Sequence, residues 1–170
     1  QGWARGFNAK HPAVRVQGEG KGSSTAPPAL IETQAQIGPM SRAMSEEEKD
    51  RFVAKFGYQP TELRVAIDCV AIFVNKDNPI ESLSVGQVRD IFVGKINNWS
   101  EVGGPALPIT RYSRDEKSGT RDTFDSLVLN KQPIAAGTRE YADNAALSDS
   151  VASDPGGIGH AGIAYVRTCK

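Results

Sequence analysis

The stretch Leu63–Val74 (LRVAIDCVAIFV) carries the strongest strand signal in the chain and decides its fold class. Only Arg64 and Asp68 interrupt a run of apolar side chains. A nearly continuous apolar run of this kind is typical of a strand that is buried on both faces of a sheet. We therefore expect Leu63–Val74 to be one long strand in the interior of a mostly parallel sheet.

Helix and strand signals alternate on both sides of this run. Upstream, Ser45 and Glu48 form a capping-box pattern that predicts a helix to about Phe56. Downstream, Ser84 and Ser118 are N-cap residues of two further helices, which end near residues 92 and 129. Further helices are expected at 2–10, 26–32 and 141–151, and further strands at 13–17, 35–40, 109–112 and 159–166. The alternation predicts an α/β fold.

Composition excludes several classes of function. Twenty basic residues balance twenty acidic residues among 170, which argues against a nucleic-acid coat and leaves room for one small anion. No apolar run approaches the roughly 20 residues of a membrane helix, and no leader is visible. Two cysteines and two histidines are too few for a zinc cluster of the usual spacing, so no metal and no cofactor is expected.

Two hydroxyl-rich loops run directly into predicted helices. They are Gly22–Thr25 and Ser118–Thr120. Unpaired N–H groups at a helix N-terminus, together with the positive end of the helix dipole, form an anion site, and Ser and Thr hydroxyls add donors. Arg114 lies four residues before Ser118 and is placed to reach across the loop and grip a tetrahedral anion. This pattern predicts an oxyanion site.

Two other interpretations of these loops stay open at this point. A Ser-Gly-Thr sequence at a helix start is often only an N-cap. An enzyme with Ser118 or Ser23 as nucleophile is the second interpretation, but no catalytic base lies near either hydroxyl in the sequence. The glycine-rich loop also lacks the Gly-Lys-Ser/Thr of a phosphate-binding P-loop. We therefore expect a binding protein and not an enzyme.

The order of seven short motifs resembles the phosphate-binding component of the bacterial phosphate ABC importer. The motifs are Gly22–Thr25, Ile37–Arg42, Asn75–Pro79, Ile91–Lys95, Trp99 with Gly103 and Gly104, Arg114–Thr120, and Pro155–Gly159. They run over essentially the whole chain.

The resemblance implies a type II periplasmic binding protein with two α/β lobes and the oxyanion in the cleft between them. The lobes would comprise residues 1–66 and 67–168, with crossover strands near 65–70 and 164–169. The implied function is binding of inorganic phosphate for ABC-type uptake or sensing, with the transporter permease as a partner. The implied location is the periplasm, the cell envelope or the extracellular space.

The resemblance also implies a set of ligand residues. These are Ser23, Ser24, Ser41, Arg114, Ser118, Gly119 and Thr120, with Thr25, Arg42 and Asp68 as further candidates. Ser41 stands where many relatives have an aspartate, which accepts a hydrogen bond from a protonated phosphate and repels fully ionised sulfate. The serine weakens that discrimination, so the alternative is a binding-protein fold that has lost its ligand or changed it to sulfate, another oxyanion or a protein. Arg42 either adds a second cation to the site or pairs with a surface acid.

The chain departs from the family at both ends. The family begins with a strand and a Thr-rich loop, whereas this chain begins at the following helix, and it stops where the family's chain returns to the first lobe. The first lobe is then left with an unpaired gap, so we expect either a fragment or an intertwined homo-oligomer. Cys69 and Cys169 fall on the two crossover strands, which implies a disulfide, the alternative being two buried thiols.

Overall fold

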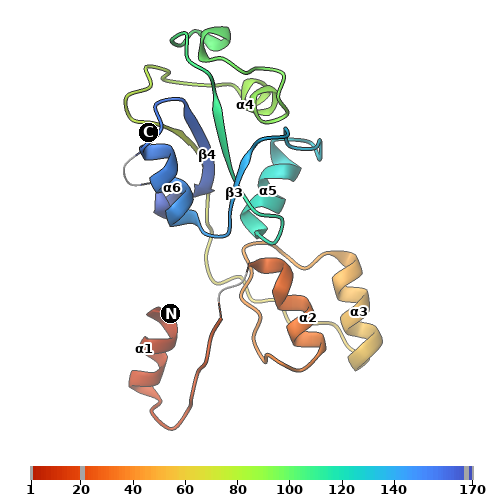
Figure 1. Cartoon of the computed structure of the whole chain (residues 1–170). Coiled ribbons are helices and arrows are strands. Elements are labelled where there is room, and N and C mark those ends of the chain that lie inside the picture. The colour runs from red at the N-terminus through yellow and green to blue at the C-terminus, as the bar shows by residue number, and fades with distance from the viewer. Residues whose placement is uncertain (1, 20–21, 167–168, 170) are drawn as a thin grey trace.

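The computed structural model describes residues 2–19, 22–166 and 169 of the chain. Their strands form one four-stranded sheet in the order β1-β4-β2-β3 (Figure 1). The strands are β1 Val70–Val74, β2 Thr110–Arg114, β3 Arg139–Tyr141 and β4 Gly157–Gly162. β2 pairs in parallel with β3 and β4, whereas β1 runs antiparallel to β4 with Val70 opposite Gly162. The predicted α/β class is confirmed, and the sheet is mixed because β1 runs against the other three strands.

Six helices and three short 3-10 segments complete the described residues. The helices are α1 Gly2–Lys10, α2 Ala26–Ile31, α3 Glu46–Phe56, α4 Val85–Phe92, α5 Gly119–Leu127 and α6 Asn144–Ala152, and the 3-10 segments are η1 Ser23–Thr25, η2 Trp99–Val102 and η3 Ile163–Tyr165. The capping box predicted at Ser45 is confirmed, since the Ser45 and Glu48 side chains bond each other's backbone N–H groups. None of the described helices has the length and apolar character needed to cross a bilayer.

Two apolar clusters cover the two faces of the sheet. Adjacent strand residues point to opposite faces, and Phe73 and Val74 accordingly belong to different clusters. One cluster joins Val74 to α4, η2 and α5, and its fully buried members include Phe92, Trp99, Phe124 and Ile158. The other joins Phe73 to α6 through Leu147 and Val151. The sheet and its helices, residues 70–166, are called the sheet part below.

The first residues of the predicted long strand are not a strand. Of Leu63–Val74, only Val70–Val74 pairs with a neighbour, and residues 59–69 form no element. Leu63, Val65 and Ile67 are 78%, 68% and 103% exposed, so the expected burial on both faces is wrong for this half. The second expected crossover strand, near 164–169, is also wrong where it is described, because η3 occupies Ile163–Tyr165 and residues 167 and 168 lie outside the described residues.

The strands expected at 13–17 and 35–40 are absent as well. Before β1 the described residues contain helices and loops only, so neither segment has a strand to pair with. Helices α2 and α3 pack against each other below the sheet, and residues 22–57 are called the helical part (Figure 1). Helix α1 buries none of its residues, and Trp3 is 73% exposed.

Candidate functional site

The N-terminus of α5 is built as an anion cradle. Ser118 is its N-cap, and the Ser118 hydroxyl accepts a hydrogen bond from the Arg121 N–H at 3.3 Å. The N–H groups of Gly119 and Thr120 belong to the first turn, where no preceding turn supplies a carbonyl acceptor. Ser118 and Thr120 are only 2% and 9% exposed, so these donors lie in a sheltered place. Two N–H groups and the positive end of the helix dipole therefore converge on one point.

Ser23 and Ser41 of the helical part lie directly against this helix end. Their hydroxyl oxygens are 3.1 Å apart, and the Ser41 N–H donates to the Ser23 hydroxyl at 3.0 Å. A Cβ atom on Gly119 would lie 2.5 Å from the Ser41 hydroxyl oxygen and closer still to that of Ser23. Only glycine fits between the helix and the two serines. Three predicted ligand residues, Ser23, Ser41 and Gly119, thus lie together.

The loop that carries Ser23 is docked onto the loop before α5. Both the N–H and the hydroxyl of Ser24 donate to the carbonyl of Lys117, at 3.4 and 3.1 Å. The N–H and hydroxyl of Thr25 donate to the carbonyl of Gly22, at 3.2 and 2.8 Å. Gly22 has a φ of 91°, and a Cβ there would clash with the Lys117 carbonyl. The hydroxyls of Ser24 and Thr25 therefore hold the loop, and their predicted role as ligands stays a prediction.

Arg114 ends β2, but its guanidinium is held by the chain between β3 and α6. Nε donates to the Tyr141 carbonyl at 3.1 Å, one Nη donates to the Asn144 side-chain oxygen at 2.6 Å, and the other donates to the Ala142 carbonyl at 2.7 Å. Arg114 is 7% exposed, and this burial lowers the pKa of its guanidinium. The reach across its own loop towards Ser118 is not seen, and its role as a ligand stays a prediction.

Arg42 links the helical part to the first turn of α5. Its Nε donates to the Asp122 carboxylate at 2.6 Å, and its two Nη atoms donate to the Glu48 carboxylate at 2.8 Å each. The hydrogen bond with Glu48 is the main cause of the raised pKa of Arg42, and that with Asp122 adds to it. Of the two roles weighed for Arg42, the structure shows pairing with acids, which balances its charge.

Asp68 and the two cysteines lie elsewhere. Asp68 is exposed beside Gly162, and its carboxylate accepts from the Cys69 N–H at 2.8 Å. The disulfide expected between Cys69 and Cys169 stays a prediction. The two lie in different settings: Cys69 is exposed, whereas the Cys169 thiol donates to the Ser148 carbonyl at 3.6 Å and packs on the α6 side of the sheet. The alternative of two buried thiols is wrong for Cys69.

A buried polar network behind α5 was not predicted. The Ser113 hydroxyl lies 2.9 Å from His160 Nε2 and accepts from Arg121 at 3.2 Å. The His160 ring stacks on Phe124 at 4.0 Å, and burial, aided by the charges of Arg121 and Arg114, lowers the pKa of His160 to about 3. No local signal marks this network, because its members come from β2, β4 and α5, and only the fold brings them together.

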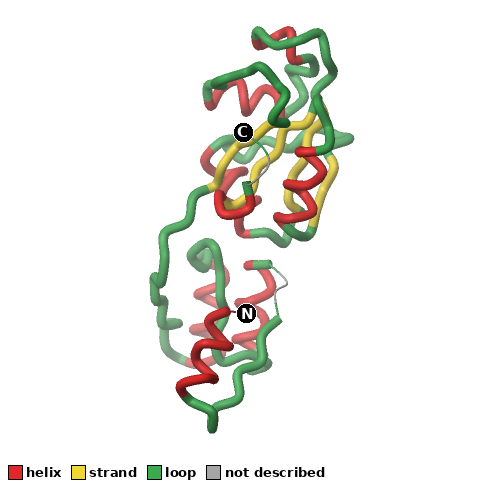
Figure 2. The backbone as a smooth tube through the Cα atoms, turned by 90° about the vertical axis from the view of Figure 1, so that its left-hand side faces the viewer, coloured by secondary structure: helices red, strands yellow, loops and turns green. Residues whose placement is uncertain are grey.

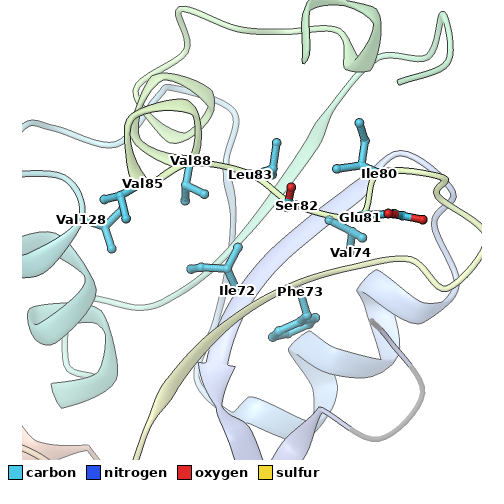
Figure 3. A pocket seen from close by; sticks show the side chains of 10 residues that line it. All are labelled: Ile72, Phe73, Val74, Ile80, Glu81, Ser82, Leu83, Val85, Val88 and Val128. Carbon is cyan, nitrogen blue, oxygen red and sulfur yellow. The ribbon is translucent and has the colours of Figure 1, made fainter. Parts of the chain in front are cut away.

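A pocket lined mainly by aliphatic side chains lies away from the N-terminus of α5. It has a volume of about 480 Å³ and lies between β1 and the segment that leads into α4 (Figure 3). Its lining is mostly aliphatic: Ile72, Phe73, Val74, Ile80, Glu81, Ser82, Leu83, Val85, Val88 and Val128. Glu81 is its only charged side chain, and it has the wrong sign for an anion site. The oxyanion candidate therefore remains the N-terminus of α5.

Comparison with known families and curated proteins supports the resemblance of the motifs. The PBP superfamily domain matches residues 1–169. The chain is 38% identical over 175 residues to the phosphate-binding protein PstS of Pseudomonas aeruginosa, covering 96% of this chain and 54% of that protein. It is 32% identical over 167 residues to PstS of Bacillus subtilis, covering 98% and 54%. The chain thus spans about half the length of the curated relatives it matches.

Solved structures share the arrangement of the whole chain. A putative phosphate ABC transporter substrate-binding protein from Clostridium perfringens, solved with bound phosphate, superposes with a TM-score of 0.85 at 31% identity, covering 97% of this chain and 65% of that one. An ABC-type phosphate transport receptor from Vibrio cholerae superposes with a TM-score of 0.77 at 28% identity, covering 98% and 68%. The helical part and the sheet part therefore follow the fold of type II periplasmic binding proteins.

Proposed function

Because the chain belongs to the PBP superfamily and is PstS-like along nearly its whole length, we propose that it binds inorganic phosphate between α5 and the Ser23–Ser41 pair. The relatives are binding proteins, and the family is one of binding proteins and not of enzymes. The observation that carries the proposal is Gly119, where the two serine hydroxyls of the helical part meet the first turn of α5 too closely for any side chain.

This arrangement suits a tetrahedral oxyanion for a physical reason. In this proposal the phosphate would accept hydrogen bonds from the N–H groups of Gly119 and Thr120 and the Thr120 hydroxyl of α5. The Ser23 and Ser41 hydroxyls of the helical part would donate the others. Hydroxyls rotate, so the bond between Ser23 and Ser41 is readily exchanged for bonds to an anion. Charge-assisted hydrogen bonds are about twice as strong as neutral ones, which favours an ionised ligand over water.

We extend the proposal to the biological role that the relatives' names suggest. The Clostridium and Vibrio proteins are described as parts of phosphate ABC transport. By analogy, the protein to which this chain belongs would deliver phosphate to a transporter permease, or report its concentration, from the periplasm or the outer side of the cell envelope. Because the chain spans about half of its curated relatives, this role is proposed for the whole protein.

Isothermal titration of the chain with phosphate, and then with sulfate, tests the binding proposal. We expect one phosphate per chain. Thr120→Val keeps the side-chain shape but removes the hydroxyl, and should weaken phosphate at least about tenfold, a loss of about 1.4 kcal/mol. Thr138→Val is the matched control, because the Thr138 hydroxyl donates to the Ala135 carbonyl, outside the α5 site. Absence of heat with both anions would overturn the proposal.

A second function is favoured by one observation: the named site residues Ser23, Ser41, Ser118 and Thr120 all carry hydroxyls, and none of these four is a carboxylate. Ser41 is a hydroxyl residue, and Arg114 is engaged by Tyr141, Ala142 and Asn144. Without an acceptor carboxylate, a fully ionised anion such as sulfate is not repelled. Tighter binding of sulfate than of phosphate would assign the changed ligand, and no binding of either would assign a fold that has lost its ligand or serves protein interaction.

A further inference from the structure

The loop 114–121, which contains the proposed phosphate donors, is closed at its base by the Arg121 guanidinium. Nη1 of Arg121 donates to the Arg114 carbonyl at 3.1 Å and so joins the end of β2 to the first turn of α5. The same nitrogen donates to the Glu140 carboxylate at 3.0 Å, and Nε donates to the two Asp125 oxygens at 2.8 and 2.9 Å. Arg121 is only 7% exposed, and the two carboxylates balance its charge. The guanidinium therefore fixes the two ends of the loop relative to each other.

Ser113 adds a second hydrogen bond at the same point. Ser113 on β2 and His160 on β4 lie on neighbouring strands, drawn in yellow in Figure 2. The Ser113 hydroxyl donates to the Arg114 carbonyl at 3.0 Å, accepts from Arg121 at 3.2 Å and lies 2.9 Å from His160 Nε2. A serine hydroxyl has one proton to donate and two lone pairs that accept. Because the proton goes to the Arg114 carbonyl, both lone pairs are left for donors, and His160 Nε2 must carry a proton.

The other ring nitrogen of His160 leads to the same assignment by a separate route. Nδ1 is shielded from solvent and has no hydrogen-bond partner among the described residues. The ring is fully buried, stacks on Phe124 at 4.0 Å and meets Phe92 edge-on at 5.8 Å. A proton on Nδ1 would be a buried donor without an acceptor, whether the ring were neutral or charged, and such donors are costly. Nδ1 is therefore bare, and the single proton of the neutral ring is on Nε2.

We propose that His160, as the Nε2–H tautomer, is a positioning residue for the phosphate site and acts through Ser113 without touching the anion. This role rests on the proposed function, because it concerns the donors at Ser118–Thr120. The imidazole N–H orients the Ser113 hydroxyl, and that hydroxyl holds the Arg114 carbonyl, where the loop leaves β2. Donors that are fixed before the ligand arrives bind it more tightly than donors that must first be ordered. His160 thus sets how well the loop is preorganised for phosphate.

Nitrogen-15 NMR of the imidazole rings tests the tautomer without any ligand. The chain has two histidines, and His11→Asn leaves His160 as the only one. At neutral pH we expect Nε2 to carry a directly bonded proton that exchanges slowly with water, and Nδ1 to show the chemical shift of a bare nitrogen. His11, which is exposed, is the internal comparison in the unchanged chain. A proton found on Nδ1 would overturn the proposal.

Substitutions at position 160 test the positioning role in the free chain. His160→Leu removes the N–H donor, whereas His160→Gln keeps one on a side chain of similar reach. The readout is amide hydrogen exchange of Ser118, whose N–H donates to the Asp115 carbonyl at 3.1 Å. We expect this exchange to be about tenfold faster in His160→Leu and nearly unchanged in His160→Gln, because one hydrogen bond of the network is lost or kept. Val151→Ala opens a cavity on the other face of the sheet, where Val151 is fully buried, and should leave the Ser118 exchange unchanged.

Phosphate titration of the same variants measures whether the order of the loop reaches the ligand. We expect His160→Leu to bind phosphate about fivefold more weakly, and Ser113→Ala, which removes only the hydroxyl between His160 and the loop, to behave alike. His160→Gln and Val151→Ala should keep the affinity of the unchanged chain. An equal loss in His160→Leu and Val151→Ala, or no loss in His160→Leu, would overturn the positioning role. If the unchanged chain bound no phosphate, the proposed function would fail, and the tautomer and the Ser118 exchange would still decide whether His160 orders the loop.

Discussion

The hydroxyls of Ser23 and Ser41 lie 3.1 Å apart although eighteen residues separate them in the chain. Both belong to the helical part, and both face Gly119 of the sheet part. At this contact the helical part presents two hydroxyl groups, and α5 presents backbone without a side chain. The junction is therefore polar and is not held by apolar packing. The proposed site exists only while the helical part and α5 stay in contact at this junction.

Gly119→Ala should open the junction. A Cβ at this position would collide with both serine hydroxyls, so the helical part must move away from α5. Phosphate should bind at least about tenfold more weakly, while the helix itself should be no less stable, because alanine is the better helix former. Isothermal titration and thermal unfolding measure the two effects. Gly86→Ala in α4 makes only an ordinary contact, 3.8 Å from the Ser84 hydroxyl oxygen, and should leave the affinity unchanged. Unaltered affinity in Gly119→Ala would move the site away from this junction.

The pair of Arg42 and Asp122 should couple the helical part to α5. Arg42→Gln and Asp122→Asn should each cost about 1 kcal/mol of the free energy of unfolding, because each leaves a partly sheltered partner without its hydrogen bond. The double variant should cost less than the sum of the two, which urea denaturation in a double-mutant cycle measures. Strict additivity would mean that the pair contributes nothing across the junction.

Acid should destabilise the chain through His160. The folded chain keeps His160 neutral down to about pH 3, whereas the unfolded chain takes up that proton near the ordinary pKa of 6.5. The unfolded state then binds more protons, so stability is lost as the pH falls between these values, by at most about 1.4 kcal/mol per pH unit. His160→Asn should flatten the slope of stability between pH 6.5 and pH 4.5. The exposed His11, changed to Asn, should leave it unchanged.

Arg114→Ala should destabilise the chain between β3 and α6. The variant removes three hydrogen bonds from a buried cation, to Tyr141, Ala142 and Asn144, and the cost should be about 2–4 kcal/mol in chemical denaturation. The exposed Arg15, changed to Ala, should cost little. If Arg114→Ala kept its stability but lost phosphate binding, the main role of Arg114 would be to bind phosphate and not to hold the chain between β3 and α6.

Local patterns predicted the helix caps in both the helical part and the sheet part. The capping residues Ser45, Ser84 and Ser118 each cap the helix expected of them, because a cap is made within one turn of chain. The strand predicted over Leu63–Val74 is formed only by its last five residues, Val70–Val74. Its apolar run continues upstream of Val70, but the backbone there has no neighbour, and a strand exists only where another strand accepts its hydrogen bonds.

Some features of the candidate site could likewise be predicted from the sequence, and others could not. The Ser-Gly-Thr stretch and the glycine-serine loop could be recognised as donor-rich helix starts from sequence alone, because their chemistry is local. The direction of the Arg114 guanidinium could not be predicted from the sequence. Its acceptors are loop carbonyls and the Asn144 side chain, about thirty positions away in the chain. The network of Ser113, His160 and Arg121 could not be predicted from the sequence either, because its members come from two strands and a helix that only the fold brings together.

What the sequence by itself determined is the class of the fold, the helix caps and the hydroxyl-rich loops, all of which depend on spacing within a few residues. What only the tertiary structure decided is which donors face one another. Ser23, Ser41 and Gly119 meet, Arg42 pairs with Glu48 and Asp122, and residues 61–68 make no backbone-to-backbone hydrogen bond with other described residues. The physical reason is that hydrogen bonds and ion pairs form over about 3 Å in space, whatever the separation along the chain.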